Sequence, residues 1–203
     1  PGLADQPPRR QDPLSHVVYF DCPSGASGDM ILGALVDAGV PLDALRMELA
    51  TLPLAGWTLS TREVRRGAFR ATKVDVTIAH DAIEHPHRTL ADVVAILRAG
   101  RLAPPVREAA ERVFTRLAEA EARAHGSTPG AVHFHDVGAV DAIVDVTGAA
   151  VGVALLGADA IHASALPIGG GFVDGPHGRI PLPAPGTAEL LRGWPVVDTG
   201  VRG

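Results

Sequence analysis

The chain has 203 residues, a formal net charge of −5 and a hydrophobic fraction of 46%. This length suits one compact domain or two small ones, with a core mainly of Ala, Val, Leu and Ile. The apolar stretches are shorter than the about 20 residues of a membrane span, and no basic stripe suggests nucleic acid. We find no basic-then-apolar leader, and the single cysteine, Cys22, excludes an internal disulfide. We therefore expect a cytoplasmic protein that binds neither membrane nor nucleic acid.

Residues 1–15 are rich in Pro, Arg, Gln and Asp, which predicts a disordered lead-in before one domain over 16–203. Hydrophobic periodicity and turn residues then predict the following elements. We expect strands or extended segments at 16–21, 131–136 and 160–166, and a hairpin formed by 57–66 and 68–79. We expect helices around 31–38, 41–49, 89–97, 104–125, 139–156 and 187–191. This order predicts an α/β fold, with a mixed sheet flanked by helices and a β-hairpin insertion.

A glycine-rich turn, Asp21-Cys-Pro-Ser-Gly-Ala-Ser-Gly-Asp29, follows the first predicted strand. Backbone N–H groups at the helix start, with small residues around them, can hold a phosphate or carboxylate. The alternative is a tight turn in which Ser27 or Asp29 caps the helix. The only lysine, Lys73, lies far away, so this is not the phosphate loop of nucleoside triphosphatases. The candidate phosphate-binding residues are Ser24, Gly25, Ser27, Gly28 and Asp29.

The strongest candidate metal site is the segment His133-Phe-His135-Asp136-Val-Gly-Ala-Val-Asp141-Ala-Ile-Val-Asp145. In an extended chain both imidazoles point to one side, and Asp141 and Asp145 share one face of an apolar helix. Buried carboxylates need a cationic partner, which could be an arginine, a protonated histidine or a metal. The alternative is a salt-bridge network with Arg179 or Arg88. The candidate ligands for nickel, zinc or manganese are His133, His135, Asp136, Asp141 and Asp145.

Two further segments carry polar side chains that could bind a ligand. The Pro-rich strip 176–185 presents His177 and Arg179, which suit a phosphate or carboxylate clamp, although a solvated loop explains them as well. The polar loop 80–88 contains His85 and His87, which could capture a metal and pass it on, or be ordinary loop histidines.

Together these stretches resemble the nickel insertion protein family of the nickel-pincer cofactor pathway, known as LarC. The resemblance rests on Tyr19 to Met30, on His133 to Asp145 and on His177-Gly-Arg-Ile-Pro-Leu-Pro-Ala-Pro185, in the family's order. It implies CTP-dependent insertion of nickel into pyridinium-3,5-bisthiocarboxylate mononucleotide, in a lyase-class reaction that makes the cofactor of lactate racemase. Full-length members are about twice as long, and their CTP site, with manganese or magnesium, lies in a C-terminal half that this chain does not match.

The resemblance assigns roles to the candidate residues. His133 and His135 are candidate catalytic bases, because insertion at the pyridinium ring requires the loss of a ring proton. The loop residues, His177 and Arg179 would hold the substrate's phosphate. The other hypotheses are a non-catalytic nickel-binding subunit that needs a separate C-terminal partner, and a metal-dependent phosphohydrolase. Homo-oligomerisation stays open.

Overall fold

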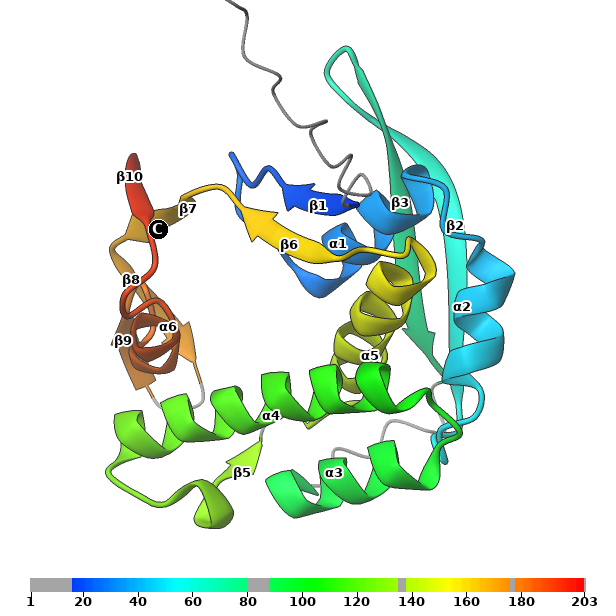
Figure 1. The fold of residues 1–203 in the computed structure, drawn as a ribbon. Helices are drawn as coiled ribbons and strands as arrows, with labels where there is room; N and C mark the ends of the chain where they lie inside the picture. The colour runs from blue at the N-terminus through cyan, green and yellow to red at the C-terminus, as the bar shows by residue number, and fades with distance from the viewer. Residues whose placement is uncertain (1–15, 80–87, 135–137, 176–177, 203) are drawn as a thin grey trace, which may run out of the picture.

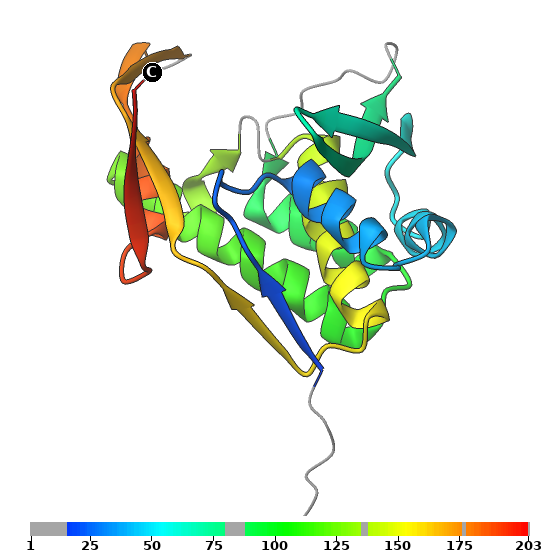
Figure 2. The same cartoon turned by 90° about the horizontal axis from the view of Figure 1, so that it is seen from above.

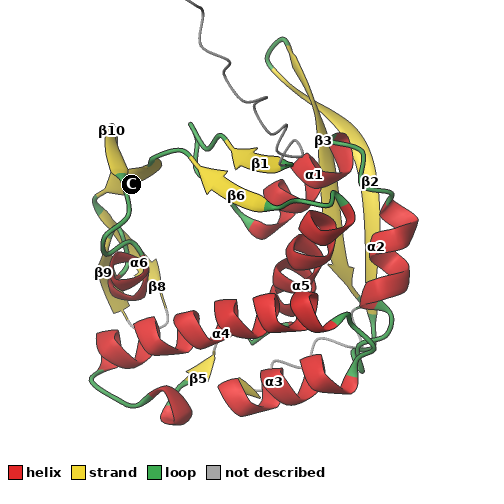
Figure 3. Ribbon diagram, viewed as in Figure 1, coloured by secondary structure: helices red, strands yellow, loops and turns green. Residues whose placement is uncertain are grey.

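The structure, a computed structural model, describes residues 16–79, 88–134, 138–175 and 178–202. The predicted lead-in at 1–15 and most of the loop 80–88 lie outside these residues. The helices are α1 (Gly28–Asp37), α2 (Leu42–Leu49), α3 (Leu90–Ala99), α4 (Pro104–His125), α5 (Val140–Leu155) and α6 (Pro185–Leu190), with a 3-10 turn at Pro129–Ala131. Figure 3 shows these helices mixed with short strands, which confirms the α/β class.

The strands pair two by two, in five two-stranded sheets among the described residues. The parallel pairs are β1 (Val17–Phe20) with β6 (Ala160–Ala163), and β7 (Leu166–Gly170) with β10 (Val196–Arg202). The antiparallel pairs are β2 (Trp57–Arg66) with β3 (Phe69–Ile78), β4 (Arg88–Thr89) with β5 (His133–Phe134), and β8 (Phe172–Gly175) with β9 (Gly178–Pro181).

Helix α5 lies at the centre of the helical part of the molecule. It contacts α1 and α2 on one side and α4 on the other, and α3 packs along α4 (Figure 1). The same elements appear in this arrangement from above (Figure 2). Their fully buried side chains form one core, which includes Leu32, Leu45, Val74, Phe114 and Ile143. Burial of this apolar surface is the main stabilising term for the fold.

Helix α1 packs closely on strand β3 because Gly33 has no side chain. A Cβ atom at Gly33 would lie 2.4 Å from the carbonyl oxygen of Thr72. At the end of α1 the hydroxyl of Thr72 donates a hydrogen bond of 2.6 Å to Asp37. This close packing brings the first turn of α1 beside Lys73 and fixes the surroundings of the glycine-rich turn.

The hairpin and the long helix agree closely with the sequence. The hairpin pairs Trp57 with Ile78 and Arg66 with Phe69, and α4 runs from Pro104 to His125, as predicted. Helix α4 ends at Gly126, whose φ of 63° lies in the left-handed region that glycine adopts without strain.

Three strand predictions differ from the structure. A single mixed sheet does not form among the described residues, because the extended segment 160–170 changes partner. Its first part pairs with β1 and its second part with β10, and the break lies at Ser164, whose hydroxyl accepts a hydrogen bond of 2.8 Å from the Cys22 N–H. The segment 131–136 is a strand only at His133–Phe134, because Pro129 begins a 3-10 turn.

The Pro-rich strip is not a single extended segment. Its first part forms β9, which pairs with β8, and Pro185 begins α6. Proline is suited to the first position of a helix because the missing N–H has no intrahelical partner there. The described part of the strip is therefore a short strand followed by the start of a helix.

Candidate functional site

The glycine-rich turn and the apolar helix α5, separate in the sequence, meet in the structure. Gly28, the first residue of α1, lies against Asp145 of α5. A Cβ atom at Gly28 would lie 2.2 Å from Oδ2 of Asp145 and 2.5 Å from its Cβ. Two of the predicted site segments thus come together at the junction of α1 and α5.

The turn itself is held by backbone hydrogen bonds. The Gly25 N–H donates a bond of 3.1 Å to the Cys22 carbonyl, and Gly25 has a φ of 87°, which favours glycine. Ser27 occupies the N-cap position of α1, but its side chain does not cap the helix. Its hydroxyl donates instead to Oδ1 of Asp29, which also accepts a 2.9 Å bond from the Met30 N–H. The alternative in which Ser27 caps the helix is therefore wrong, and Ser24 and Ser27 are both exposed.

Asp145 is half-buried and has no counter-charge among the described residues. Its Oδ1 atom is inaccessible to solvent and accepts no hydrogen bond from the described part of the chain. Burial, and then repulsion from Asp29 and Asp141, raise the pKa of Asp145 to about 6. Asp29 and Asp141 are thus close enough to Asp145 to affect it electrostatically. A cation at this position would reverse that effect.

Neither of the two arginines considered as partners neutralises these aspartates. The guanidinium of Arg88 donates to the Gly138 carbonyl, and that of Arg179 stacks 4.7 Å from the ring centre of Phe172. The ion pairs of the described residues include neither Asp141 nor Asp145. The salt-bridge hypothesis for Arg88 and Arg179 is therefore wrong for Asp141 and Asp145, whereas Asp136 lies outside the described residues.

Lys73 lies at the candidate site, although the sequence analysis did not select it. Its ammonium lies 3.1 Å from Oδ2 of Asp29 and 3.3 Å from Oδ1 of Asp75. Hydrogen bonds to these two carboxylates raise the pKa of Lys73, while the pKa of Asp29 is lowered by the Ser27 hydroxyl and then by Lys73. Lys73 is far from the turn in the sequence but adjacent to it in space. The sequence offered one signal for this contact. Lys73 is the only lysine of the chain, and the glycine-rich turn has an aspartate at each end that a lysine could pair with.

His133 is exposed on the short strand β5 and is paired across it with Thr89. It lies near the start of α3, where the pKa of Asp92 is lowered by hydrogen bonds from Thr89 and, to a lesser extent, by Arg88 and His133. The structure thus places His133 by an acid that the sequence analysis did not select.

Five predicted site residues lie outside the described residues, namely His85, His87, His135, Asp136 and His177. Within the described ranges, no group of three or more His, Cys, Asp or Glu side chains is arranged to hold a metal ion. Asp29, Asp141 and Asp145 are therefore an acidic group and not a complete metal cage.

Comparison with known proteins identifies the family. A family model described as nickel insertion protein matches residues 18–203. The chain belongs to the nickel insertion protein family.

Curated relatives from the family cover most of this chain. The chain is 49% identical over 180 residues to a protein of Citrifermentans bemidjiense and 52% identical over 183 residues to one of Geotalea uraniireducens, both named "Putative nickel insertion protein". Each match covers 89% of this chain and 46% of the relative. A protein of Roseiflexus castenholzii with the same name is 49% identical over 178 residues. The chain thus spans just under half the length of these relatives, and no solved structure matches it.

Asp29 and Asp145 come from two of the three motifs by which the chain resembles the family, and these two motifs meet at one junction. Among the described residues, no helix has both the length and the apolarity needed to cross a membrane.

Proposed function

We propose that this chain holds nickel for insertion into an organic cofactor, with Asp29, Asp141 and Asp145 contributing to the ion's site. The observation that carries this proposal is the half-buried carboxylate of Asp145, which is repelled by two other acids and forms no ion pair within the described residues. A buried acid without a partner is unfavourable unless a cation joins it. Nickel, bound as substrate, would supply that charge, and mixed nitrogen and oxygen ligands suit it.

The remaining ligands would come from the histidine segments. We assign His133, His135 and Asp136 to the completion of the nickel site, and His85 and His87 to the delivery of the ion. Loss of a proton from the substrate's ring must accompany formation of the carbon–nickel bond, and a neutral His133 or His135 could accept that proton. These assignments follow from the family resemblance and from ligand chemistry.

The glycine-rich turn would hold the phosphate of the substrate. Support comes from the exposed hydroxyls of Ser24 and Ser27, the absence of a Ser27 cap on α1, and the ammonium of Lys73 nearby. Helix starts with uncapped N–H groups favour anions. His177 and Arg179 are further candidates for this role, and Arg179 would have to leave Phe172 to take part.

The resemblance supplies the chemical details of the proposed reaction. The substrate would be pyridinium-3,5-bisthiocarboxylate mononucleotide, and the product would be the nickel-pincer cofactor of lactate racemase, made by a lyase-class cyclometallase. CTP and manganese or magnesium would bind to the part of the relatives that this chain does not match. A cytoplasmic location, expected from the single cysteine, agrees with this chemistry.

A second candidate function is a nickel-binding subunit that is active only with that remaining part. This function is favoured because the match to this chain covers only 46% of the length of each of these two relatives. Incubation with nickel, CTP and substrate, with and without a polypeptide comprising the rest of a relative, separates the two functions. Turnover by this chain alone would exclude the second function.

Equilibrium dialysis against nickel tests the proposed site. We expect Asp145→Asn to weaken nickel binding by about tenfold or more, since changes outside the first ligand sphere alone have effects of 10- to 100-fold. The matched control is Asp43→Asn on α2, whose carboxylate is exposed and paired with Arg46. Equal nickel affinity in Asp145→Asn, Asp43→Asn and the unmodified chain would remove Asp145 from the site. The double variant His133→Ala, His135→Ala tests the histidines in the same assay.

A further inference from the structure

The two parallel strand pairs carry several large apolar side chains that are exposed. Their exposed apolar side chains lie on both sides of the strand pairs, because Ile161 is in register with Val18 and not with Val17 or Tyr19. We call the surface that they form the parallel-strand face; it consists of Val17, Tyr19, Ile161, Val196, Val197 and Val201, which are 43–64% exposed. By contrast, the β2–β3 hairpin buries Leu59 and Val74 against helices. Parallel strands are usually covered on both faces, and a two-stranded sheet alone is only marginally stable. The parallel strands β1, β6, β7 and β10 therefore lack the packed elements that normally bury both faces of a parallel sheet.

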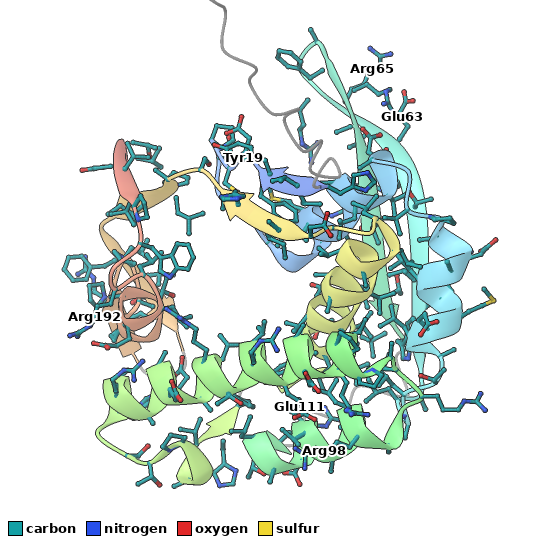
Figure 4. All side chains as sticks on the ribbon, in the orientation of Figure 1. Tyr19, Glu63, Arg65, Arg98, Glu111 and Arg192 are labelled. Atoms are coloured by element: carbon teal, nitrogen blue, oxygen red, sulfur yellow. The ribbon has the colours of Figure 1, made fainter. Side chains whose placement is uncertain are left out.

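The parallel-strand face is continuous along the chain and in space. Strand β6 leads into β7, and the Ser164 N–H bonds to Phe20 while the Leu166 N–H bonds to Pro195, so one extended segment joins β1 to β10. Figure 1 places these four strands on the side of the molecule away from α3 and α4. Tyr19 lies at the outer side of the β1–β6 pair, away from α4 (Figure 4).

A groove extends this face beneath β1. It has a volume of about 530 Å³ and lies between β1, the apolar side of α1 and the residues after α5, where Ala34, Leu35 and Leu156 line it. Val18 and Phe20 point toward this groove and are only half-buried. The strand pair is thus open to contact on both sides.

The chemistry of the face indicates the kind of partner. Strand β1 (Val-Val-Tyr-Phe) has no charged residue, and the chain's only lysine, Lys73, is on the hairpin. Edge strands that stay free usually have lysine, proline or a bulge to prevent pairing. Strand β7 has Pro167 and β10 has a register shift, whereas β1 has none of these features. A membrane or nucleic acid surface would require basic residues around the patch. An apolar, uncharged edge suits a polypeptide that adds strands and packs on them.

We infer that the parallel-strand face is the docking surface for the part of the nickel insertion polypeptide that this chain does not match. The relatives contain more than half their length outside the match, which is enough chain to cover this face. This inference rests on the proposal that the remaining part acts together with this one, but not on the nickel site. The occupant is polypeptide from the same family, and a second copy of this chain is the competing outcome.

Cysteine labelling tests the inference. Cysteine is placed at Tyr19 and Val197 in this chain and at the aligned positions of the full-length Citrifermentans bemidjiense relative, and maleimide labelling rates are compared. We expect labelling at least tenfold slower in the relative at both positions. The controls are cysteines at Met47 on α2 and Phe69 at the hairpin tip, which are 69% and 80% exposed and lie off the face. They should label at equal rates in both proteins.

Two results would overturn the inference. Equal rates at Tyr19 and Val197 in the two proteins would show that the rest of the relative does not cover the face. Slow labelling in this chain itself, with a doubled mass in solution, would assign the face to a second copy. Hydrogen exchange of unmodified proteins gives an independent measurement, in which strands β1, β6 and β10 should be protected more strongly in the relative. Neither measurement uses nickel, so failure here is distinguishable from failure of the proposed function.

Discussion

The acids of α4 and α6 differ from those at the junction of α1 and α5. Glu111 of α4 accepts bonds of 2.9 and 3.1 Å from Arg98 of α3, and these two side chains meet between the helices (Figure 4). Glu189 of α6 pairs with Arg123 and Arg192. Asp145 is half-buried and has no arginine or lysine paired with it in the described part of the chain.

This difference separates structural acids from a functional one. An arginine beside a carboxylate lowers its pKa and joins two elements of the fold, as Arg98 does for Glu111. The Asp145 carboxylate instead has a raised pKa and destabilises the ionised folded state. A protein that keeps an unfavourable charge often does so for function. The four predictions below test this contrast, from the largest effect to the smallest.

The largest effect should come from Gly28→Ala, which tests the contact between α1 and α5. The new Cβ would meet the side chain of Asp145, and we expect a loss of about 1–3 kcal/mol, typical of overpacking. In a domain of this size, that lowers the melting temperature by roughly 2–12 °C. Alanine has the higher helix propensity, so the loss would come from the contact.

The control for this variant is Gly130→Ala. A Cβ at Gly130 has no heavy atom within 4 Å, so its melting temperature should be nearly unchanged. If Gly28→Ala also melts at the unmodified temperature, Asp145 does not pack against the start of α1, and the proposed site loses its geometry.

Asp145→Asn should stabilise the protein at neutral pH while it weakens nickel binding. The pKa of Asp145 is raised from 3.8 to about 6, so the folded state binds its proton more tightly than the unfolded state. Its ionisation therefore lowers stability as the pH rises from about 4 to 6. Asparagine avoids this loss, and we expect a gain of about 1 kcal/mol at pH 7, after allowance for solvent screening of a half-buried group.

Thermal unfolding as a function of pH checks this prediction. The variant should melt roughly 2–4 °C above the unmodified chain at pH 7 and at the same temperature near pH 4. A lower melting temperature at pH 7 would mean that Asp145 has a stabilising partner and belongs with the structural acids.

The sequence predicts the regular elements well and the site only in part. The limits of α4 follow from Pro104 and Gly126, and the shared face of Asp141 and Asp145 follows from their spacing of four. These features depend on neighbouring residues alone.

The contacts that make the site depend on packing between distant segments. Lys73 reaches Asp29 across 44 positions because Gly33 lets α1 pack onto β3. Asp145 meets Gly28 because α1 and α5 are buried against each other. Hydrophobic periodicity indicates that both helices are buried, but it does not indicate which residues of the two helices are in contact. It also does not predict that the extended segment changes its pairing partner at Ser164.

Glu111→Gln should change the free energy of unfolding in the opposite direction to Asp145→Asn, and by a smaller amount. Removing the carboxylate ends its pairing with Arg98, and we expect a loss of about 0.5–1 kcal/mol at pH 7, the upper range for a surface pair. The pKa of Glu111 is lowered by Arg98, so its contribution is present above the ordinary value of 4.5 and is lost as the pH falls below it. Thermal unfolding at pH 7 and near pH 4 measures this.

The matched control is Glu108→Gln on the same helix. Glu108 is exposed and takes part in no ion pair of the described residues, so its replacement should leave the melting temperature unchanged. Equal effects of the Glu108 and Glu111 variants would show that net charge, and not the Arg98 pair, determines stability here.

The smallest change in stability should come from Lys73→Gln, whose effect lies in the electrostatics of the site. Without the ammonium, Asp29 stays ionised through its hydrogen bond from Ser27, and the junction becomes more negative. The pKa of Asp145 should then rise above its value of about 6, measured by carboxyl NMR titration. Nickel should bind more tightly above that pKa, because the ion no longer meets a neighbouring cation.

The control is Arg62→Gln, since Arg62 pairs with Asp75 and not with Asp29. An unchanged titration of Asp145 in Lys73→Gln would separate the lysine from the acidic group and leave it as part of the hairpin alone.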